Sequence, residues 1–392
     1  MIARLLARAD QAAGGRAVDA ALYALSGVFA LITALSSTLL PHRAWGAVAA
    51  WGYLAALLLT PFVNRLLLTW ATFAAVSLLP LVLQAVQRAG GRTDRAQEEV
   101  SVVEAMGRQL YLSRADIAAL PPSEQLDAYH PYQPGMAVFG LPRAWFGEMW
   151  WTDSRIWFAV AMIAALAFVV PNVRSLQAAT VFPVCALTLA TGGDDMPVLA
   201  LCLLALALCA RDRFGAAGLA VGAAAALKLF AYPVVIVLLI LAVVTGRWRR
   251  FVPGAIGLPL LVLVPPLLID ADALVENVIR FPMGHGLVAS PAQSPFPGHL
   301  IASTLPGGRY VASALLVLAG LAIAVVLLRR PPRTAASAAL FCGYGLLTAI
   351  LLMPTTRFGY LLYPVAFLVW AAALSTSTGS MAPRHDAALY RQ

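Results

Sequence analysis

Twelve apolar runs follow one another along the chain, separated by short polar or basic segments. They cover residues 20–41, 44–61, 66–87, 156–171, 176–190, 196–210, 215–228, 230–245, 251–269, 310–328, 335–353 and 358–374. A membrane-spanning helix needs about 20 apolar residues, with a range of roughly 17 to 25. The pattern therefore predicts an all-α, polytopic membrane bundle of about 10 to 12 transmembrane helices.

The stretch 215–245 is too short for two full spans, yet basic residues flank it on both sides. Arginines cluster at 211–213 before it and at 247–250 after it. Both clusters favour the cytoplasmic side of a membrane. We therefore predict that the chain enters and returns here as a short helical hairpin, with Lys228 near its tip.

Twelve crossings place both termini in the cytoplasm, with a cytoplasmic tail at 375–392. The long loops 88–155 and 270–309 then face the outside. This arrangement leaves most arginines of the short segments on the cytoplasmic side, as the positive-inside rule requires. It places nearly all carboxylates outside; the exceptions are Asp10, Asp19, Asp212 and Asp386. The sequence thus predicts one multi-pass domain over 1–392 in the cell membrane, with its working surface outside.

Composition supports the same class of protein. Hydrophobic residues make up 61% of the chain and charged residues 11%, whereas soluble domains carry about 25% charged residues. The net charge of +9 is explained by membrane topology and does not call for a nucleic-acid partner. The cysteines lie in apolar runs without a CxxC pair, which supports neither a zinc site nor a disulfide framework; they are Cys185, Cys202, Cys209 and Cys342.

The first long loop carries carboxylates on a predicted amphipathic helix over 98–112. Its apolar face holds Val100, Val103 and Gly107. The three carboxylates of this segment are Glu98, Glu99 and Glu104. A carboxylate near the membrane surface could act as a general base towards a hydroxyl group. Acidic residues also favour a helix N-terminus because of its dipole, so a purely structural role is an alternative.

A second acidic motif is the tight turn 192–197, which carries Asp194 and Asp195 after two glycines. Adjacent carboxylates at a membrane surface are costly. They could bind a divalent metal, orient a sugar or serve as the base. The alternative is a solvated turn in which Asp195 caps the following helix, since it stands just before Met196 and Pro197.

Four candidate cations share the predicted outer face. Lys228, the single lysine of the chain, lies in an apolar run, so it must snorkel or pair with a phosphate or buried carboxylate. Arg280 and His285 lie in the second long loop, and Arg357 lies on the short tip 355–360. Such groups could stabilise a departing phosphate. Taken singly, the histidine could be incidental and the arginine an interfacial anchor.

Several of these stretches resemble glycosyltransferase family 87, bacterial membrane enzymes of the GT-C class that depend on polyprenol-phosphate sugars. The similar stretches are 99–104, 132–143, 192–197, the Ala- and Gly-rich run ending at Lys228, 281–282, 290–291 and 356–360. The resemblance implies a GT-C fold, a catalytic carboxylate in the first large external loop and an inverting transfer. In GT-C enzymes that loop usually follows the first span. Here it follows the third, so either two spans are added or fewer precede it.

The resemblance and the residues together predict a hexosyltransferase. It would move a sugar such as mannose from a polyprenyl-phosphate donor to a hydroxyl of a lipid or glycan acceptor. The base is one of the five carboxylates, and we favour Glu99 because it lies in the first external loop. The phosphate would be bound by Lys228, Arg280, His285 and Arg357. No motif indicates a cofactor or a metal site, although a divalent cation remains open.

Two other functions fit the span count. A secondary transporter of twelve spans would place ionisable residues or broken helices near the bilayer midplane, whereas here they gather at the predicted outer surface. A scaffold or lipid-binding subunit would not need carboxylates beside cations. An assay for sugar transfer separates both alternatives from a transferase.

Overall fold

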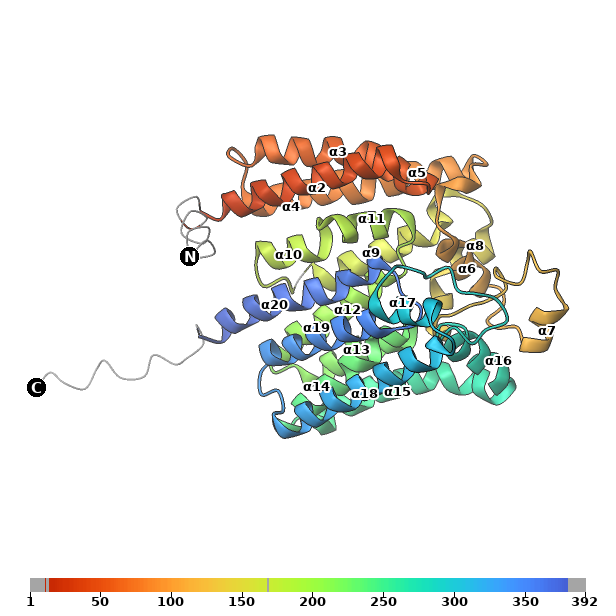
Figure 1. The fold of residues 1–392 in the computed structure, drawn as a ribbon. Helices are drawn as coiled ribbons and strands as arrows, with labels where there is room; N and C mark the ends of the chain where they lie inside the picture. The colour runs from red at the N-terminus through yellow and green to blue at the C-terminus, as the bar shows by residue number, and fades with distance from the viewer. Residues whose placement is uncertain (1–10, 12–13, 168, 380–392) are drawn as a thin grey trace, which may run out of the picture.

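The fold is built from helices. The computed structural model describes residues 14–167 and 169–379, together with Gln11. Within these ranges there is no β-strand, and the only extended pairing is an isolated bridge between Gln293 and Thr356. The long helices lie side by side in layers (Figure 1). The long loops gather at one end, here called the loop-bearing end, and α2 starts and α20 ends at the opposite end. The predicted all-α bundle is confirmed.

From Arg16 onwards, three helical runs precede the first long loop and form one layer of the bundle (Figure 1). They are α2 (Arg16–Ser36), α3 (Leu40–Leu59) and a continuous run of α4 (Arg65–Phe73), the π-helical turn η1 (Ala74–Leu78) and α5 (Leu79–Ala89). A π-turn disturbs the regular backbone ladder, and the indole of Trp45 donates a hydrogen bond of 2.8 Å to the Val76 carbonyl within it. The first long loop therefore follows the third helical run, as the sequence indicated.

The other apolar runs also form helices where the sequence predicts them. They are α9 (Ser154–Leu166), α10 (Val173–Thr180), α11 (Pro183–Thr191), α12 (Asp195–Ala210), α13 (Phe214–Leu227), η5 (Leu229–Ala231), α14 (Tyr232–Val244), α15 (Trp248–Ile269), α18 (Gly308–Arg329), α19 (Ala335–Leu352), η7 (Phe358–Leu361) and α20 (Leu362–Gly379). The predicted tail therefore starts later than 375, because α20 continues to Gly379; residues 380–392 lie outside the described part of the chain.

The helices differ in length and hydropathy, and therefore in whether they can span a membrane. In the described part of the chain six are long and apolar enough, or seven if the bent pair α10 and α11 counts as one span. That pair bends by 44° at Pro183, which cannot donate the helical hydrogen bond. Shorter apolar helices, including α12 and α13, complete the bundle. Almost every residue of α12 is buried, as expected of a helix that is hydrophobic on all sides.

The predicted hairpin around Lys228 is confirmed. Asp212 precedes α13 and Arg247 follows α14, and these two residues form an ion pair of 2.9 Å. The two ends of the α13–α14 segment therefore meet at the opposite end of the bundle, and Lys228 lies at the far tip. The close contact between α13 and α15 depends on glycine. A Cβ on Gly222 would lie 2.1 Å from the Gly254 carbonyl oxygen, which is typical of small-residue packing between membrane helices.

The long loops contain more structure than the sequence suggested. The first holds η2 (Thr93–Arg95), α6 (Glu98–Met106), α7 (Arg114–Ala119), η3 (Pro134–Phe139), α8 (Leu141–Phe146) and η4 (Trp150–Thr152); the second holds α16 (Ala271–Val275), the π-turn η6 (Glu276–Arg280) and α17 (Pro297–Thr304). The helix predicted over 98–112 ends at Met106, because Gly107 packs against the backbone of Gly140 with no room for a Cβ.

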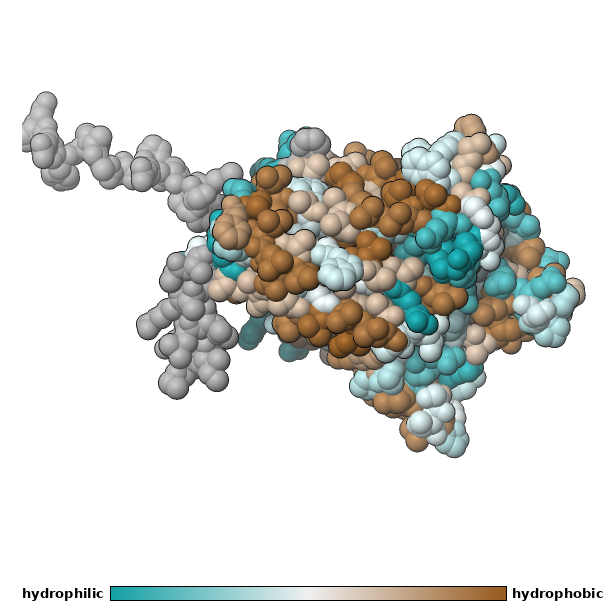
Figure 2. All heavy atoms as spheres, turned by 90° about the horizontal axis from the view of Figure 1, so that it is seen from above, coloured by the Kyte–Doolittle hydropathy of each residue, from teal (hydrophilic) through white to brown (hydrophobic). Residues whose placement is uncertain are grey.

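The surface agrees with a membrane setting. Figure 2 shows apolar side chains over the body of the molecule and most polar side chains towards the loop-bearing end. Large apolar side chains such as Leu35, Trp51 and Phe62 are exposed on the layer of α2 to α5. A continuous apolar surface of this kind is unfavourable in water and suits contact with lipid.

Candidate active site

Lys228 and two carboxylates form a buried cluster at the loop-bearing end. The Lys228 Nζ donates hydrogen bonds to Asp194 Oδ2 at 2.7 Å and to Asp195 Oδ1 at 2.5 Å. All three side chains are buried, with exposed fractions between 6% and 8%. Lys228 follows the last residue of α13 and has an extended backbone, whereas Asp195 is the first residue of α12. The sequence proposal that Lys228 meets a buried carboxylate thus agrees with the structure.

The depth of this cluster follows from helix length. α12 has 16 residues and α13 has 14, so at 1.5 Å per residue they span about 24 and 21 Å. A hydrocarbon core is about 30 Å thick. Since both helices meet at the opposite end, their loop-side ends stop short of the far side of such a core. Charged residues at such ends must pair with one another.

Aromatic side chains surround the ammonium group. The hydroxyl of Tyr363 donates a hydrogen bond of 2.7 Å to Asp195 Oδ1. The Lys228 Nζ lies 5.4 Å from the ring centre of Tyr132 and 5.3 Å from that of Tyr360, within the range of cation–π attraction. Asp195 is therefore occupied by Lys228 and Tyr363. The capping alternative for Asp195 is wrong, because Asp195 is the first residue of α12, the N-cap position is Asp194, and no side-chain hydrogen bond caps this helix.

The glycines before the carboxylates have a steric role. Gly193 has a φ of +88°, and a Cβ there would lie 2.7 Å from the Phe158 ring. Only glycine adopts this backbone conformation without strain. The turn can therefore place Asp194 and Asp195 against Lys228 while its backbone packs on α9.

Glu99 forms an ion pair with Arg357. Its side chain is 12% exposed, and that of Arg357 is 31% exposed. The start of α6 is held against the end of α11, because the Gln97 amide donates a hydrogen bond of 2.9 Å to the Thr191 carbonyl. The Thr191 hydroxyl also donates to Gln97 Oε1 at 3.1 Å. Glu99 thus lies beside the turn that carries Asp194, and the predicted base and a predicted cation meet there.

Arg357 is positioned by the second long loop. The Thr356 amide donates to the Ala292 carbonyl, and the Ser294 amide donates to the Thr356 carbonyl, both at 2.9 Å. The Phe358 amide donates to the Ser294 hydroxyl at 3.0 Å. Since Tyr360 follows three residues later and packs on Lys228, this segment connects the ion pair of Glu99 to the lysine cluster.

Glu104 and Glu98 have different surroundings. Glu104 accepts two hydrogen bonds from Arg88, at 2.7 and 2.8 Å, and is 8% exposed. Arg88 also pairs with Asp153 at 3.2 Å, and Arg155 contacts Asp153 at 2.7 Å. Glu104 therefore belongs to a buried ionic network that joins the first long loop to α5 and α9. Glu98 is exposed.

The network controls the pKa of Asp153. Burial alone would raise this pKa, but the charges and hydrogen bonds of Arg155 and Arg88 outweigh burial and lower it from 3.8 to about 2. A carboxyl whose pKa is lowered by folding stabilises the fold above its ordinary pKa. The contribution of Asp153 is therefore complete above pH 3.8 and is lost as the pH falls to about 2.

Arg280 and His285 belong to another cluster. Arg280 pairs with Asp272 at 2.8 Å and with Glu276 at 3.4 Å, and the His285 ring lies 5.5 Å from that of Tyr310. Arg280 is 41% exposed. The structure brings Glu99, Asp194, Asp195, Lys228 and Arg357 together at one place, whereas the direct partners of Arg280 and His285 lie in the long loops and at the start of α18.

Glu276 connects the two long loops. It accepts hydrogen bonds from Arg114 at 2.8 Å and from Tyr129 at 2.7 Å. Burial would raise the pKa of Glu276, but these hydrogen bonds and the Arg114 charge lower it below its ordinary value. Burial raises the pKa of Tyr129 to about 12. Both groups therefore keep their hydrogen bonds at neutral pH and fix the second loop on the first.

Among the described residues, no group of three or more His, Cys, Asp or Glu side chains is arranged to hold a metal ion. Between Asp194 and Asp195 the Lys228 ammonium occupies the bridging position.

The comparisons with known proteins decide the family. The model of glycosyltransferase family 87 matches residues 129–354, which is more than half of the chain. The chain belongs to glycosyltransferase family 87. The family membership and the apolar helices show a multi-pass membrane protein, and the secondary transporter is not favoured. The match includes Asp194, Asp195, Lys228, Arg280 and His285; Glu98, Glu99 and Glu104 precede it and Arg357 follows it.

Solved structures give a more distant likeness, and no curated protein matches the chain. ArnT from Cupriavidus metallidurans bound to undecaprenyl phosphate is 16% identical with a TM-score of 0.46, over 78% of this chain and 59% of ArnT. The same protein in the apo state is 18% identical with a TM-score of 0.43, over 79% and 60%. The family 87 chain thus spans about three fifths of the length of ArnT.

Several residues that surround the predicted ones had no role assigned from the sequence. The aromatic side chains Tyr132, Tyr360 and Tyr363 contact the lysine cluster, and the arginines Arg88, Arg143 and Arg155 hold Glu104 and Asp153. A signal for the second group was present. Opposite charges at 153 and 155 stand directly before an apolar run, where an unpaired charge would be costly.

Arg155→Leu should destabilise the fold by about 3–5 kcal/mol, the typical cost of removing one partner of a buried ion pair. Arg155 is fully buried, and the change also leaves the Ala190 and Arg95 carbonyls without their donor. Thermal unfolding in detergent measures the effect. The control is Arg92→Leu, which removes an exposed pair with Asp94 and should change little. Equal unfolding temperatures for the two variants would contradict the role of the network.

Proposed function

We propose that this enzyme transfers a hexose, such as mannose, from a polyprenyl-phosphate donor to a hydroxyl of a lipid or glycan acceptor. The observation that carries the proposal is the ion pair of Glu99 and Arg357 beside the Lys228 cluster. A base for the acceptor and a cation for a phosphate meet at the loop-bearing end of a membrane glycosyltransferase. A donor with a lipid anchor accounts for the location of such a site close beneath the membrane surface.

The proposed reaction is a single displacement. The acceptor oxygen forms a bond to the anomeric carbon while the bond from that carbon to the phosphate oxygen breaks. Glu99 takes the acceptor proton, and the polyprenyl phosphate leaves with the electron pair of the broken bond. This displacement inverts the anomeric centre. Arg357 stabilises the charge that develops on the phosphate, as a preorganised cation does in the transition state.

Arg357 would pair first with Glu99 and then with the donor phosphate. In the free enzyme it neutralises Glu99. A donor phosphate competes for the same guanidinium, which offers five N–H donors in a fork. Once the phosphate engages Arg357, the Glu99 carboxylate is released towards the acceptor hydroxyl. Donor binding therefore prepares the base.

Lys228 has one donor left for the phosphate. An ammonium group has three N–H donors, and two of them bind Asp194 and Asp195. We propose that the third reaches a phosphate oxygen and that Asp194 accepts a hydrogen bond from a sugar hydroxyl. Arg280 and His285, on the second loop, would contact the donor further from the reacting carbon.

We propose that the loop-bearing end faces the outside and that both termini are cytoplasmic. The arginines at 211–213, 247–250 and 329–333 all lie at the opposite end, and basic residues are retained in the cytoplasm. Ser123→Cys and Ser303→Cys should react with a membrane-impermeant maleimide in intact cells, and Arg330→Cys should not. All three positions are exposed, and the native cysteines are buried. Labelling of Arg330→Cys alone would show that the orientation is the opposite of the one proposed.

An assay for sugar transfer tests the function. Purified enzyme in lipid nanodiscs would be given radiolabelled polyprenyl-phosphate mannose, glucose or arabinose together with a membrane extract as the source of acceptor. We expect label from a hexose donor to appear in a lipid or glycan product with wild-type enzyme and to be absent with Glu99→Gln. Transfer from the arabinose donor alone would contradict the hexose assignment, and no transfer from any donor would contradict the donor class.

A further inference from the structure

A histidine from the layer of α2 to α5 contacts the first long loop next to the proposed base. His42 is the third residue of α3 and precedes the apolar run 44–61. Its Nε2 lies 2.8 Å from the amide nitrogen of the Gln97 side chain. Gln97 stands directly before α6, two residues before Glu99. The layer, which also lies next to α11 (Figure 1), therefore contacts the segment that carries Glu99.

The hydrogen bond between these side chains has one direction. The amide nitrogen of a glutamine can only donate, so the Nε2 of His42 accepts and the ring proton lies on Nδ1. Burial lowers the pKa of His42 from 6.5 to about 4, and the positive charge of Arg357 acts in the same direction. His42 is therefore neutral at neutral pH and keeps its lone pair for Gln97.

Gln97 is held from a second side by the end of α11. Its backbone amide donates to the Thr191 carbonyl at 2.9 Å, and its Oε1 accepts from the Thr191 hydroxyl at 3.1 Å. A Cβ on Gly192 would lie 2.9 Å from this Oε1, so the glycine leaves the space that the side chain needs. Gln97 therefore joins α3 and the start of α6 to the turn that carries Asp194.

The start of α6 is set by these contacts and not by its own cap. Gln97 occupies the N-cap position of α6 but forms no side-chain hydrogen bond with that helix. Glutamine is also not among the residues that are preferred at this position. Since Glu99 is the second residue of α6, the place of its carboxylate depends on how Gln97 is held.

We propose that His42 and Gln97 are positioning residues of the sugar-transfer site. His42 holds the Gln97 side chain at the end of α11, and Gln97 thereby fixes Glu99 relative to the turn of Asp194. Both residues act through Glu99 and not on a reacting atom. The inference rests on the proposed function, because it takes Glu99 as the base. It gives α2 and α3, which precede the residues 129–354 of the family match, a part in catalysis.

His42→Phe tests the inference, because phenylalanine keeps a ring and removes the acceptor. The turnover number at saturating donor should fall by roughly 10- to 100-fold, the scale of loss for a reacting group that is misplaced by about 1 Å. The KM for the donor should stay close to the wild-type value, since the proposed donor cations are unchanged. His42→Gln, whose Oε1 can accept the same hydrogen bond, should recover most of the turnover. A purely structural role would predict neither result.

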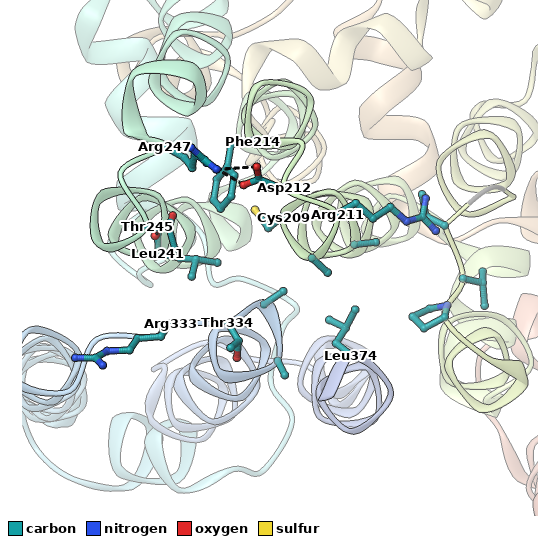
Figure 3. A pocket seen from close by; sticks show the side chains of 17 residues that line it. Cys209, Arg211, Asp212, Phe214, Leu241, Thr245, Arg247, Arg333, Thr334 and Leu374 are labelled. Atoms are coloured by element: carbon teal, nitrogen blue, oxygen red, sulfur yellow. Dashed lines mark hydrogen bonds and ion pairs between the residues drawn. The ribbon is translucent and has the colours of Figure 1, made fainter. Parts of the chain in front are cut away.

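Two controls separate this effect from a general loss of stability. Trp45 lies three residues further along α3, and its indole donates one hydrogen bond of 2.8 Å to the Val76 carbonyl. Trp45→Phe therefore also keeps a ring and loses one hydrogen bond of the same helix. Asp212→Asn removes the ion pair with Arg247 at the opposite end of the bundle, beside a cavity of about 440 Å³ (Figure 3). Both variants should keep turnover near the wild-type rate.

Hydrogen exchange tests the contact without sugar transfer. The amides at the start of α6 should exchange faster in His42→Phe than in the wild type, because local opening there loses one of its restraints. They should exchange at the wild-type rate in Trp45→Phe. In a double-mutant cycle, His42→Phe combined with Gln97→Leu should lose no more turnover than Gln97→Leu alone, since residues that act through one contact are not additive.

The outcomes distinguish this inference from the proposed function. Wild-type turnover in His42→Phe, an equal loss in Trp45→Phe, or no recovery in His42→Gln would overturn the inference and leave the function intact. Unchanged exchange at α6 in His42→Phe would show that the hydrogen bond does not hold the helix. No transfer by the wild-type enzyme would contradict the proposed function, and with it the role of Glu99, whatever the exchange result.

Discussion

Glu99→Gln is expected to reduce sugar transfer by roughly 10²- to 10⁴-fold, the usual contribution of a general base, while the protein stays folded. Glutamine keeps the size of the side chain and an oxygen that can face Arg357 but cannot take the acceptor proton. The turnover number at saturating donor measures the loss. Donor affinity should not fall, because Arg357 no longer has a carboxylate to neutralise.

The control for this variant is Glu98→Gln. Glu98 neighbours Glu99 on α6 but is exposed, so its loss should leave turnover near the wild-type rate. An active Glu99→Gln together with an inactive Asp194→Asn or Asp195→Asn would contradict the assignment. The base would then lie in the turn after Gly192 and Gly193.

Lys228→Met is expected to be the most destabilising change at the site, with a cost of about 3–5 kcal/mol. It removes the cation from between Asp194 and Asp195, which are both buried. Two adjacent carboxylates without a counter-charge repel each other in a medium of low polarity. Thermal unfolding in detergent, with and without donor, measures the effect.

Two further variants separate stability from donor binding. The combination Lys228→Met with Asp194→Asn and Asp195→Asn removes all three charges and should recover most of the lost stability without recovering transfer. Lys228→Arg keeps the charge, but its planar fork fits a point-charge site poorly, so it should fold and use the donor less well. Wild-type stability of Lys228→Met would show that the lysine is not the counter-charge of these carboxylates.

Lys228 and Arg357 differ in burial, and this difference separates their expected effects on stability and on donor use. Arg357 is 31% exposed, so water can replace its contact with Glu99, and Arg357→Ala should affect donor use more than stability. Lys228 is 8% exposed and has no such replacement. The sequence placed both on one face but could not rank their exposure.

The sequence by itself determined the class, the order of the helices and the α13–α14 hairpin. Each of these depends on local properties. Apolar run length is set by the thickness of a bilayer, and arginine clusters select a side of the membrane. Both the length of an apolar run and the arginines that flank it can be read from one short segment of the chain. The pattern of residues along the chain is therefore sufficient to predict them. The resemblance to glycosyltransferase family 87, which rested on the order of several short stretches, was confirmed by the family match.

Only the tertiary structure decided which charges meet. Glu99 pairs with Arg357, and Lys228 pairs with Asp194 and Asp195, although each pair is far apart in the sequence. Glu104 resembled Glu99 on the same predicted helix but belongs to the buried network of Arg88. The physical reason is that a buried charge needs a partner within a few ångströms. That partner is chosen by how helices far apart in the sequence pack against one another, and this packing is not recorded in the local pattern of residues.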